Sequence, residues 1–420
     1  MNVKKLALEA INQILNKNGF SNIVINEFFA KYEFTQDEKN LFTRLVLGTV
    51  EQKITLSFYL EPYLKKKPKP WLYNLLLMSL YQIIYMRIPN HAIVNEAVEI
   101  ALLKDQRLAS FVNGTLRNFL RNDLRSMDNL SELEKLSIKY SYPEWLVAYL
   151  LKDYKASEVM QIFAEFAEPK KMMIRVNTLK TSNEEVEKVF NNENIGYKKA
   201  AFLKNGYALD TNILSHPLFV EGKITVQDLA SQKVSEVLNP HPASTILDLC
   251  SAPGGKSSHL ASMVQNEAII YACDIYPHKL KLMERNFKKL GVNCVKTQLV
   301  DAREVYKYVK EQSFDYVLAD LPCSGLGVLG HKVDLKYHMS IEAIEEIISL
   351  QKEILEANYN LVKPGGYLLI STCTLNKLEN EEQVRSFIHH HPDYEIVTEE
   401  TFLPYMLHTD GFYLCKLRRK

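Results

Sequence analysis

The chain has 420 residues, of which 47% are hydrophobic and 10% aromatic, enough for packed cores in two to four globular domains at roughly 150 residues per domain. Lys and Arg (51) nearly balance Asp and Glu (50), which excludes an overall basic field, so any nucleic acid must be bound through local basic patches. The N-terminal stretch has no uninterrupted signal-peptide core, and the most apolar run, Leu75 to Met86, is too short to cross a bilayer. We therefore expect a cytoplasmic protein without a membrane partner.

Residues 1 to about 125 are predicted to form an all-α unit. Apolar residues recur there every three or four positions, as in Leu6, Ala10 and Ile14, without strict alternation. Between the two halves of this unit lies a lysine- and proline-rich stretch, Lys65 to Pro70, which predicts an exposed basic loop. A solvated run of charges and a contact with RNA phosphates are both consistent with this loop.

Two segments of the helical unit, Ile93 to Val98 and Phe111 to Arg117, resemble the RNA-binding antitermination factor NusB. The resemblance implies a helical module that docks RNA or protein, with Arg117 as a candidate phosphate contact. The alternative is that the Asn-Gly pair at 113–114 only allows close packing between helices. We predict that this NusB-like domain covers residues 1–128.

Residues 129–238 are predicted to contain linker helices and a small α/β subdomain that binds RNA. Periodicity and alternation predict helices at 145–150, 159–166 and 183–190, and strands at 170–177 and near Tyr207 and Ile224. The densest polar clusters are Arg175 to Lys180 and Thr225 to Gln232. Gln227 and Asp228 could hold a ligand beside the glycine turn that follows, although Asp228 would also cap the helix that begins near Leu229.

From residue 239 to residue 420, apolar β-rich segments alternate with helical ones. This pattern predicts a doubly wound, Rossmann-like α/β domain with a parallel sheet covered on both faces. The expected strands are 246–250, 268–273, 294–297, 316–319, 367–373, 395–397 and 412–417, and the main helices are 277–290, 341–361 and 380–388. Ligands of such folds bind at the carboxyl ends of the strands, where this chain has its carboxylate and thiol side chains.

The stretch Ser244 to Leu260, STILDLCSAPGGKSSHL, predicts a strand, a tight glycine turn and a helix. Unpaired amides at the start of the helix and glycines without Cβ atoms suit an adenosyl or nucleotide group. The two glycines are adjacent, so the four-residue spacing of a triphosphate-binding loop is missing. An ordinary strand–helix turn would explain this stretch alone, but the strand ends downstream favour a ligand.

Three aspartates stand at or after the ends of successive predicted strands. Asp274 can accept both hydroxyls of a ribose, and Asp301 can accept from an adenine amino group. Asp320 ends the next strand. Because the sequence shows no second phosphate-binding element, S-adenosylmethionine fits these strand ends better than a dinucleotide does.

Cys323 and Cys373 end adjacent predicted strands, so both thiols should open into one cleft. Either cysteine alone would be interpreted as a small buried hydrophobe. The pair beside Asp320 instead predicts covalent catalysis, in which a thiolate adds to carbon 6 of cytosine and makes carbon 5 nucleophilic toward a methyl group. Lys256 is the candidate for stabilising the thiolate. Asp320 would stabilise the charge on the ring, and Cys323 would be the second acid or base.

The remaining cysteine and histidine residues give no sign of a metal site. All six cysteines lie C-terminal to Leu249, and none has a CxxC spacing, which argues against a disulfide framework and against zinc. His389 to His391 have no carboxylate or cysteine partners at ligand spacing, so we expect no metal. The basic end of the chain, Lys416 to Lys420, could contact RNA or stay solvated.

The C-terminal half contains five motifs, in this order: DLCSAPGGKSSHL (248–260), ACDIYPHKL (272–280), DLPCSGLGVL (320–329), STCTLNKLENEEQV (371–384) and DGFYLCKLRRK (410–420). They resemble the RNA cytosine-5 methyltransferases of the RsmB (Sun, Fmu) type, within the Nol/Nop/Sun group. The resemblance implies Cys373 as the nucleophile, Cys323 as the residue that helps release product, and a small-subunit (16S) ribosomal RNA substrate; we expect a monomer that does not act on DNA. It also implies that S-adenosylmethionine is bound by Cys250, Ser251, Ala252, Pro253, Gly254, Gly255, Lys256, Asp274, Asp301 and Asp320.

The chain departs from the family pattern after Gly327, where the usual basic pair followed by Pro-Asp is replaced by Val328 to Asp334. The RNA contacts of this loop are therefore open. One alternative function is a DNA-type mechanism with Cys323, in Pro322-Cys323, as the nucleophile. Others are a cytosine-5 methyltransferase for transfer RNA or large-subunit ribosomal RNA, and a non-catalytic RNA-binding assembly factor.

Overall fold

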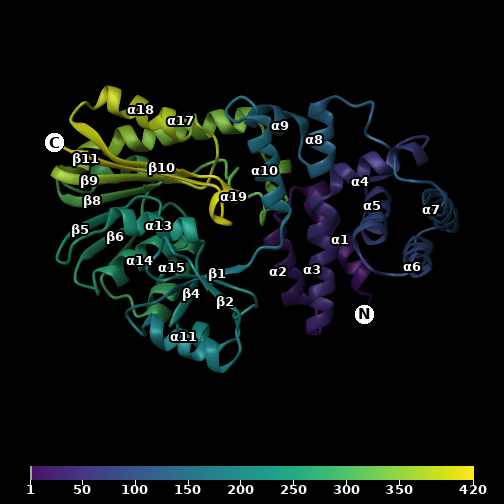
Figure 1. Cartoon of the computed structure of the whole chain (residues 1–420), viewed down its shortest axis with the longest axis horizontal. Coiled ribbons are helices and arrows are strands. Elements are labelled where there is room, and N and C mark those ends of the chain that lie inside the picture. Colours follow the sequence, from purple (N-terminus) through teal and green to yellow (C-terminus); the bar gives the residue numbers. More distant parts are fainter. Residues whose placement is uncertain (1) are drawn as a thin grey trace. The chain divides into compact units, whose positions relative to one another are not determined.

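The computed structural model describes residues 2–420, which fall into two compact units (Figure 1). The first runs to Ala167 and also contains His331–Met339, and the second consists of Glu168–Gly330 and Ser340–Lys420. Among the described residues, no helix is both long and apolar enough to cross a membrane. The cytoplasmic location, the monomeric state and the domain boundaries after residues 128 and 238 stay predictions.

The first unit is helical, as the sequence predicted, and its core consists of aliphatic and aromatic side chains spaced three or four residues apart. A capping box of Thr35 and Glu38 begins α3. The same pattern, Ser131 with Glu134, begins α8, a helix that hydrophobic periodicity did not reveal. The helices are α1 (Val3–Lys17), α2 (Ser21–Lys31), α3 (Gln36–Glu51), α4 (Lys53–Leu60), η1 (Glu61–Tyr63), α5 (Pro70–Tyr85), α6 (Asn90–Leu102), α7 (Gln106–Phe119), α8 (Glu132–Tyr140), α9 (Glu144–Leu150) and α10 (Ala156–Ala167).

One short segment of the first unit, His331–Met339, comes from far along the chain. Its helix α16 (Leu335–His338) contains Lys336, which is almost fully buried. The ammonium of Lys336 donates to the backbone carbonyl oxygens of Glu51 at 2.7 Å and Ser141 at 2.6 Å. The loop that departs from the family pattern therefore leads into a segment anchored in the helical unit by its own lysine.

The second unit begins with a four-stranded antiparallel sheet of order β2-β3-β1-β4. The helix α11 (Asn183–Asn192) packs Val186 and Phe190 against Ile174 and Tyr207 of this sheet. The predicted small α/β subdomain is thus present. Its strands are β1 (Met172–Val176), β2 (Tyr197–Lys199), β3 (Gly206–Leu209) and β4 (Ile224–Val226), with the short helix α12 (Pro217–Val220).

The rest of the second unit is built on a seven-stranded sheet of order β10-β11-β9-β8-β5-β6-β7. The five strands from β9 to β7 are parallel, as predicted. In contrast, β11 runs antiparallel to both β9 and β10, because only a short connection containing α19 (Pro404–Leu407) joins β10 to β11. The strands are β5 (Thr245–Asp248), β6 (Ile269–Asp274), β7 (Val295–Leu299), β8 (Phe314–Asp320), β9 (Val362–Thr372), β10 (Tyr394–Phe402) and β11 (Phe412–Arg419).

Helices cover both faces of this sheet (Figure 1). Leu247 and Val317 pack against α17 and α18, whereas their neighbours Ile246 and Leu318 pack against α13, α14 and α15. Successive residues of a strand point to opposite faces, so both faces are buried and the fold is doubly wound. The helices are α13 (Leu229–Leu238), α14 (Gly255–Met263), α15 (Pro277–Leu290), η2 (Ala302–Lys307), α17 (Ile341–Asn358), η3 (Tyr359–Leu361) and α18 (Glu381–His390).

The strand order reverses at β5, which lies between β6 and β8. The chain adds β6 and β7 on one side of β5 and then returns to add β8 and β9 on the other, an arrangement that leaves a crevice at the carboxyl ends of the strands. Asp248, Asp274 and Asp320 are the last residues of β5, β6 and β8, and Cys373 directly follows β9. The predicted site residues therefore share one edge of the sheet.

The strand β9 begins earlier than the sequence predicted. The Pro-Gly-Gly stretch at 364–366, interpreted as a turn before the strand, lies inside β9. Gly365 takes a φ of 80° there, and the register between β8 and β9 shifts nearby. A bulge thus absorbs the glycines without ending the strand.

Candidate active site

The glycine turn joins β5 to α14 as predicted. Gly254 caps α14 with a φ of 92°, a left-handed conformation that residues with a side chain rarely adopt. A Cβ atom at this position would also lie 2.9 Å from ring atoms of Phe287. The residues Cys250 to Pro253 lead into the bend, and Ser251 Oγ lies 2.8 Å from Ser257 Oγ. Glycine is therefore required at the bend.

Asp248, the last residue of β5, is fully buried next to this turn. Its Oδ2 accepts from the hydroxyl of Ser257 at 2.6 Å, whereas Oδ1 has no hydrogen-bond partner among the described residues. Burial raises the pKa of Asp248 to about 6, although the bond from Ser257 opposes the rise. A buried oxygen without a partner at a strand end is an acceptor that a ligand can satisfy.

Asp274 ends β6, on the opposite side of β5 from the cysteines. Its Oδ1 accepts from the backbone N–H of Tyr276 at 2.9 Å. Its Oδ2 lies 3.8 Å from the ammonium of Lys279, whose side chain is 41% exposed. One carboxylate oxygen thus orients the side chain, and the other faces only a distant, exposed cation.

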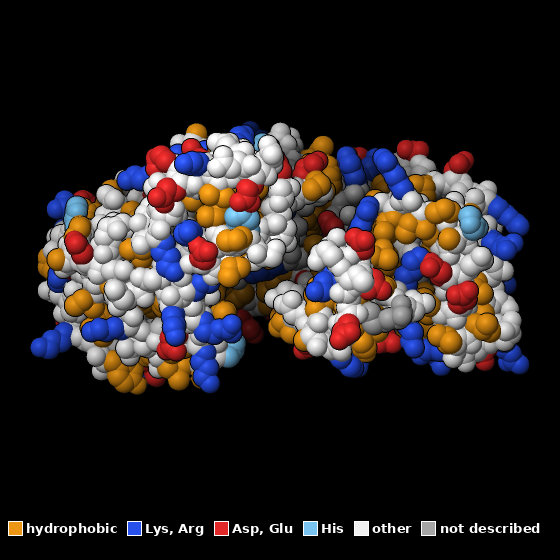
Figure 2. All heavy atoms as spheres, turned by 90° about the horizontal axis from the view of Figure 1, so that it is seen from below, with side chains coloured by type: hydrophobic (Ala, Val, Ile, Leu, Met, Phe, Trp, Pro, Cys, Tyr) orange, Lys and Arg blue, Asp and Glu red, His pale blue; other side chains and the backbone are white. Residues whose placement is uncertain are grey.

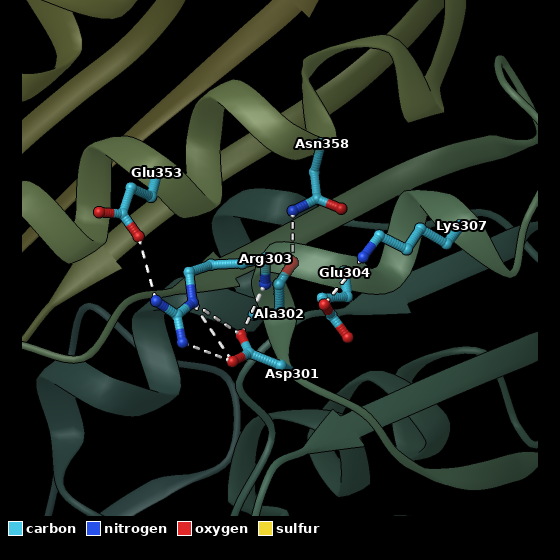
Figure 3. A network of polar contacts seen from close by, with 7 residues as sticks. All are labelled: Asp301, Ala302, Arg303, Glu304, Lys307, Glu353 and Asn358. Carbon is cyan, nitrogen blue, oxygen red and sulfur yellow. Dashed lines mark hydrogen bonds and ion pairs between the residues drawn. The ribbon is translucent and has the colours of Figure 1, made fainter.

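Figure 3 shows the contacts of Asp301, which follows β7. Arg303 Nη2 donates to Asp301 Oδ2 at 2.7 Å, and Arg303 Nη1 donates to Glu353 of α17 at 3.1 Å. Asn358, also on α17, donates to the carbonyl oxygen of Ala302 at 2.7 Å. The hydrogen bond from Arg303 lowers the pKa of Asp301. The predicted acceptor for an adenine amino group is therefore paired with a partly exposed guanidinium, which a ligand would share or displace.

Lys256, in the first turn of α14, reaches the end of β8. Its ammonium donates to Asp320 Oδ2 at 2.7 Å, and the hydroxyl of Ser371 donates to Asp320 Oδ1 at 2.8 Å. Burial disfavours the ammonium, but the negative charges of Asp320 and of the Cys373 thiolate outweigh this effect, so the pKa of Lys256 is raised. The structure thus brings Lys256, Asp320 and Cys373 together, while their individual roles stay predictions.

The two predicted catalytic thiols are in contact, since Cys323 Sγ lies 3.4 Å from Cys373 Sγ. Both side chains are partly exposed. The hydrogen bond with Cys373 and, secondly, burial raise the pKa of Cys323 well above its ordinary value. The raised pKa favours the protonated form of Cys323, whose S–H can donate toward Cys373.

One fully buried carboxylate beside the thiols, Glu379, was not predicted from the sequence. Its oxygens accept from the backbone N–H of Ser324 at 2.7 Å, from the Ser324 hydroxyl, and from Asn376 Nδ2 at 2.9 Å. Ser324 Oγ also lies 2.7 Å from Thr374 Oγ1. In the sequence, Glu379 stands in an acidic run with the exposed Glu382, and only the packing separates the two.

Gly327 and Gly411 pack three of the motifs closely together. The backbone N–H of Gly327 donates to the carbonyl oxygen of Cys373 at 3.0 Å, and Gly411 N–H donates to the carbonyl oxygen of Gly327 at 2.8 Å. A Cβ atom at Gly327 would lie 1.9 Å from the Gly411 oxygen. Three segments therefore pack closely together: the loop after Cys323, the loop after β9 and the start of β11. Glycine is needed at 327 and 411 because a side chain at either position would clash.

The polar cluster at Gln227 and Asp228 has mainly structural contacts. Asp228 caps α13, because its Oδ1 accepts from the N–H of Ala230 at 2.8 Å, and its Oδ2 accepts from the hydroxyl of Thr409 at 2.6 Å. Gln227 Oε1 accepts from Nε of the buried Arg175 at 2.8 Å. The structure thus gives Asp228 the capping role that the sequence left as an alternative.

The candidate RNA contacts of the first unit lie on its surface. Arg117 on α7 is exposed and donates to Asn113 at 2.9 Å, and the loop 64–69 before α5 exposes Lys65 to Lys67. On the face drawn in Figure 2, Lys and Arg side chains are interspersed with Asp and Glu, as the balanced composition predicts. No cluster of three or more His, Cys, Asp or Glu side chains suited to a metal occurs in residues 2–420.

Comparison with known proteins assigns the chain to a family. Family models match residues 1–121 (NusB family), 142–214 (ferredoxin-like domain of RsmF/B-like methyltransferases) and 235–418 (16S rRNA methyltransferase RsmB/F). A relative from Bacillus subtilis (strain 168), named probable ribosomal RNA small subunit methyltransferase B, is 34% identical over 100% of this chain and 99% of its own length. This chain belongs to the RsmB family. A second relative of the same name, from Synechocystis, is 31% identical over the full length of both chains.

Two solved structures have a similar fold. The crystal structure of the protein PH0851 matches 100% of this chain and 99% of its own, with a TM-score of 0.84 at 27% identity. A methyltransferase homologue from Pyrococcus horikoshii covers 69% of this chain and 100% of its own, with a TM-score of 0.62 at 26% identity. The resemblance to the RsmB family and the NusB-like front, both inferred from short motifs, are confirmed.

Proposed function

We propose that this RsmB-family protein transfers a methyl group from S-adenosylmethionine to carbon 5 of a cytosine in small-subunit (16S) ribosomal RNA. The family and the names of the relatives support the ribosomal RNA substrate, and the methyltransferase fold supports the methyl donor. The contact between Cys323 and Cys373 is the observation that supports methylation of a cytosine at carbon 5. One thiol of such a pair can add to carbon 6 of a pyrimidine, and the other can act as the acid or base in release of the product.

The methyl donor would be held by the turn Cys250 to Lys256, by Asp274 and by Asp301. Two observations fit such a ligand: the tight bend at Gly254, which has a positive φ, and the Oδ1 of Asp248, which has no hydrogen-bond partner among the described residues. When bound, the donor supplies an electrophilic methyl group on a sulfonium. Asp274 Oδ2 can then accept from ribose hydroxyls, since its nearest cation is 3.8 Å away and exposed.

Cys373 is the nucleophile in this proposal. Its sulfur bonds to carbon 6 of cytosine, and the electron pair of the 5,6 double bond becomes available at carbon 5 for the methyl group. Asp320 shares a proton with N3 of the base and stabilises the charge that develops on the ring. Lys256 and Ser371 hold the Asp320 carboxylate in place for this task. The ammonium of Lys256 also favours the thiolate of Cys373 before attack.

Once Cys373 is bonded to carbon 6, Cys323 loses its own proton to solvent. The resulting thiolate accepts the proton that leaves carbon 5 after methyl transfer, and the electron pair of that C–H bond restores the 5,6 double bond and expels the Cys373 sulfur as a thiolate. In the resting protein, the hydrogen bond to Cys373 is the largest cause of the raised pKa of Cys323. That cause disappears once the Cys373 sulfur is bonded to carbon. Cys323 therefore becomes a base at the step that needs one, which fits a role in product release.

RNA that contains 5-fluorocytosine tests these roles, because fluorine cannot leave as a proton and the covalent adduct persists. With S-adenosylmethionine present, we expect a protein–RNA adduct with the wild type and with Cys323→Ala, and none with Cys373→Ala. An adduct that survives in Cys373→Ala and vanishes in Cys323→Ala would make Cys323 the nucleophile, as in the DNA-type alternative. No adduct with any of the three proteins would overturn methylation at carbon 5.

Bisulfite sequencing tests the RNA target. Comparison of cells with and without the protein should show one cytosine of the 16S ribosomal RNA that loses its protection when the protein is absent. An unchanged 16S pattern would contradict the ribosomal assignment. A change confined to transfer RNA or large-subunit ribosomal RNA would identify the alternative substrate.

A further inference from the structure

The carboxylate of Glu379 is surrounded by hydrogen-bond donors. Oε2 accepts from the backbone N–H of Ser324 at 2.7 Å and faces Gln351 Nε2 at 3.5 Å, and Oε1 accepts from the Ser324 hydroxyl and from Asn376 Nδ2 at 2.9 Å. Two acceptor oxygens are needed to satisfy these groups, and only a carboxylate provides them. An amide of the same shape would turn an NH₂ group toward donors. Burial raises the pKa of Glu379, and the hydrogen bonds from Ser324 and Asn376 oppose that rise because they favour the charged carboxylate.

This carboxylate bridges the two cysteine loops. Ser324 directly follows Cys323, Thr374 directly follows Cys373, and the Ser324 and Thr374 hydroxyls are 2.7 Å apart. Because Ser324 Oγ donates to Glu379, the proton between the two hydroxyls comes from Thr374. A continuous chain of hydrogen bonds thus runs from one cysteine loop to the other through the bound Ser324, and it has no exposed member.

The same carboxylate acts on Cys323 through its charge. Four effects raise the pKa of Cys323: the hydrogen bond to Cys373, burial, the charge of Cys373 and the charge of Glu379. When Cys373 is bonded to a base, its two contributions are lost, whereas burial and the charge of Glu379 persist. Glu379 therefore influences both the geometry of the thiols and the choice of which thiol holds the proton.

We propose that Glu379 is the positioning residue of the thiol pair: it fixes the Cys323 loop against the Cys373 loop and keeps the proton on Cys323, so that Cys373 is the nucleophile. This inference rests on the proposed function for its biological meaning. Its physical content concerns only the two thiols, so it can be tested without RNA. A merely structural role would stabilise the fold and leave the relative reactivity of the two thiols unchanged.

Alkylation by iodoacetamide measures that reactivity in the full-length protein. Peptide mass spectrometry gives the rate at which Cys323 and Cys373 are each modified at pH 7. In the wild type, Cys373 should react first. In Glu379→Gln the ratio of the Cys323 rate to the Cys373 rate should rise about tenfold, the change in thiolate fraction expected when the pKa of Cys323 falls by one unit.

Glu382→Gln is the matched control, since it makes the same change three residues away, where the exposed Glu382 pairs only with Arg385. Its alkylation ratio should equal that of the wild type. Circular dichroism confirms that each variant is folded. A folded Glu379→Gln protein with the wild-type ratio would overturn the proposal.

Ser324→Ala provides a second test in case Glu379→Gln does not fold. It removes the hydroxyl bridge to Thr374 and leaves the Glu379 charge in place. We expect the preference for Cys373 to persist while the methylation kcat falls about tenfold at an unchanged KM for RNA. A wild-type kcat in Ser324→Ala would refute the positioning role.

The outcome also separates this inference from the proposed function. If alkylation shifts in Glu379→Gln but 5-fluorocytosine RNA traps no adduct on the wild type, Glu379 positions the thiols and the cytosine chemistry is wrong. If the wild type traps RNA and the alkylation ratio does not shift, the cytosine chemistry stands and the role of Glu379 is wrong.

Discussion

At the carboxyl ends of the strands, the residues on the two sides of β5 are held in place by different kinds of interaction. On the side of β8 and β9, the thiol loops are joined by buried polar groups, and neither Glu379 nor Ser324 has exposed surface. On the side of β6 and β7, Asp301 is paired with Arg303, whose side chain is 44% exposed. Rearranging a buried network leaves polar groups unpaired, whereas an exposed ion pair is worth only about 0 to 1 kcal/mol.

This difference suggests different roles for the side of β8 and β9, called the thiol side, and the side of β6 and β7, called the donor side. Under the proposed function, the thiol side is organised before a base binds, so the geometry of attack would not depend on the substrate. The donor side holds its carboxylates with cations that a ligand can displace, so it can adjust when S-adenosylmethionine binds. Substitutions on the thiol side should therefore change catalytic rates, and those on the donor side should change donor affinity.

The largest effect is expected from Lys256, which extends from the turn after β5 to Asp320 at the end of β8. Lys256→Met removes the cation from Asp320 and Cys373, so methyl transfer at pH 7 should fall by about 10²- to 10³-fold. Part of this loss should be recovered at higher pH, where the thiolate forms without help. The pH dependence of kcat measures both effects. Lys307→Met removes an exposed lysine paired with Glu304 and should leave the profile unchanged; a wild-type profile in Lys256→Met would contradict the account.

Asp248 is a buried carboxylate on the donor side, and burial raises its pKa to about 6 from 3.8. A folded pKa above the unfolded one means that its contribution to stability is complete below about pH 4 and is lost as the pH rises through 6. Asp248→Asn should remove this loss. Between pH 4 and pH 7, its free energy of unfolding should therefore fall by about 2 kcal/mol less than that of the wild type in urea titrations. Equal decreases in both proteins would show that Asp248 does not titrate in this range.

A substitution of Asp274 tests whether the donor side affects the affinity for S-adenosylmethionine without affecting the thiols. Asp274→Asn keeps the shape of the side chain and removes the charge that accepts from ribose hydroxyls. The Kd for S-adenosylmethionine, measured by calorimetry, should rise about tenfold. The iodoacetamide reactivity of Cys373 should not change, because the thiol side is organised separately. A change in thiol reactivity would break the division between the two sides.

The smallest effect is expected from Arg303, which competes with the ligand for Asp301. Arg303→Ala should free the carboxylate, and the Kd for S-adenosylmethionine should fall by about two- to fivefold, the value of an exposed ion pair. The same calorimetric titration measures it. Weaker binding in Arg303→Ala would mean that the arginine holds the ligand or the loop and does not compete with it.

The residues that the sequence identified stand in short contiguous motifs. A strand followed by Pro-Gly-Gly and a helix start is a local pattern, and thiols at the ends of adjacent strands meet because the fold is parallel there. These rules located the turn at Gly254, the carboxylate of Asp320 and the pair of cysteines. They also predicted the helical front of the chain, whose periodicity is local.

What the sequence did not reveal depends on contacts between distant segments. Glu379 is buried because Ser324, 55 positions away, donates to it, and its acidic neighbours give no hint of this. Lys336 looks like a surface lysine until α16 packs against Glu51 and Ser141. The antiparallel direction of β11 follows from a short connection whose length alone does not show where the strand will pair.

The central claim is that Cys373 attacks the base while Cys323 keeps its proton. Peptide mapping of the wild-type protein trapped on 5-fluorocytosine-containing 16S ribosomal RNA tests this claim most directly. We predict that mass spectrometry will find the nucleotide attached to the peptide that contains Cys373. A nucleotide attached to Cys323 would contradict it.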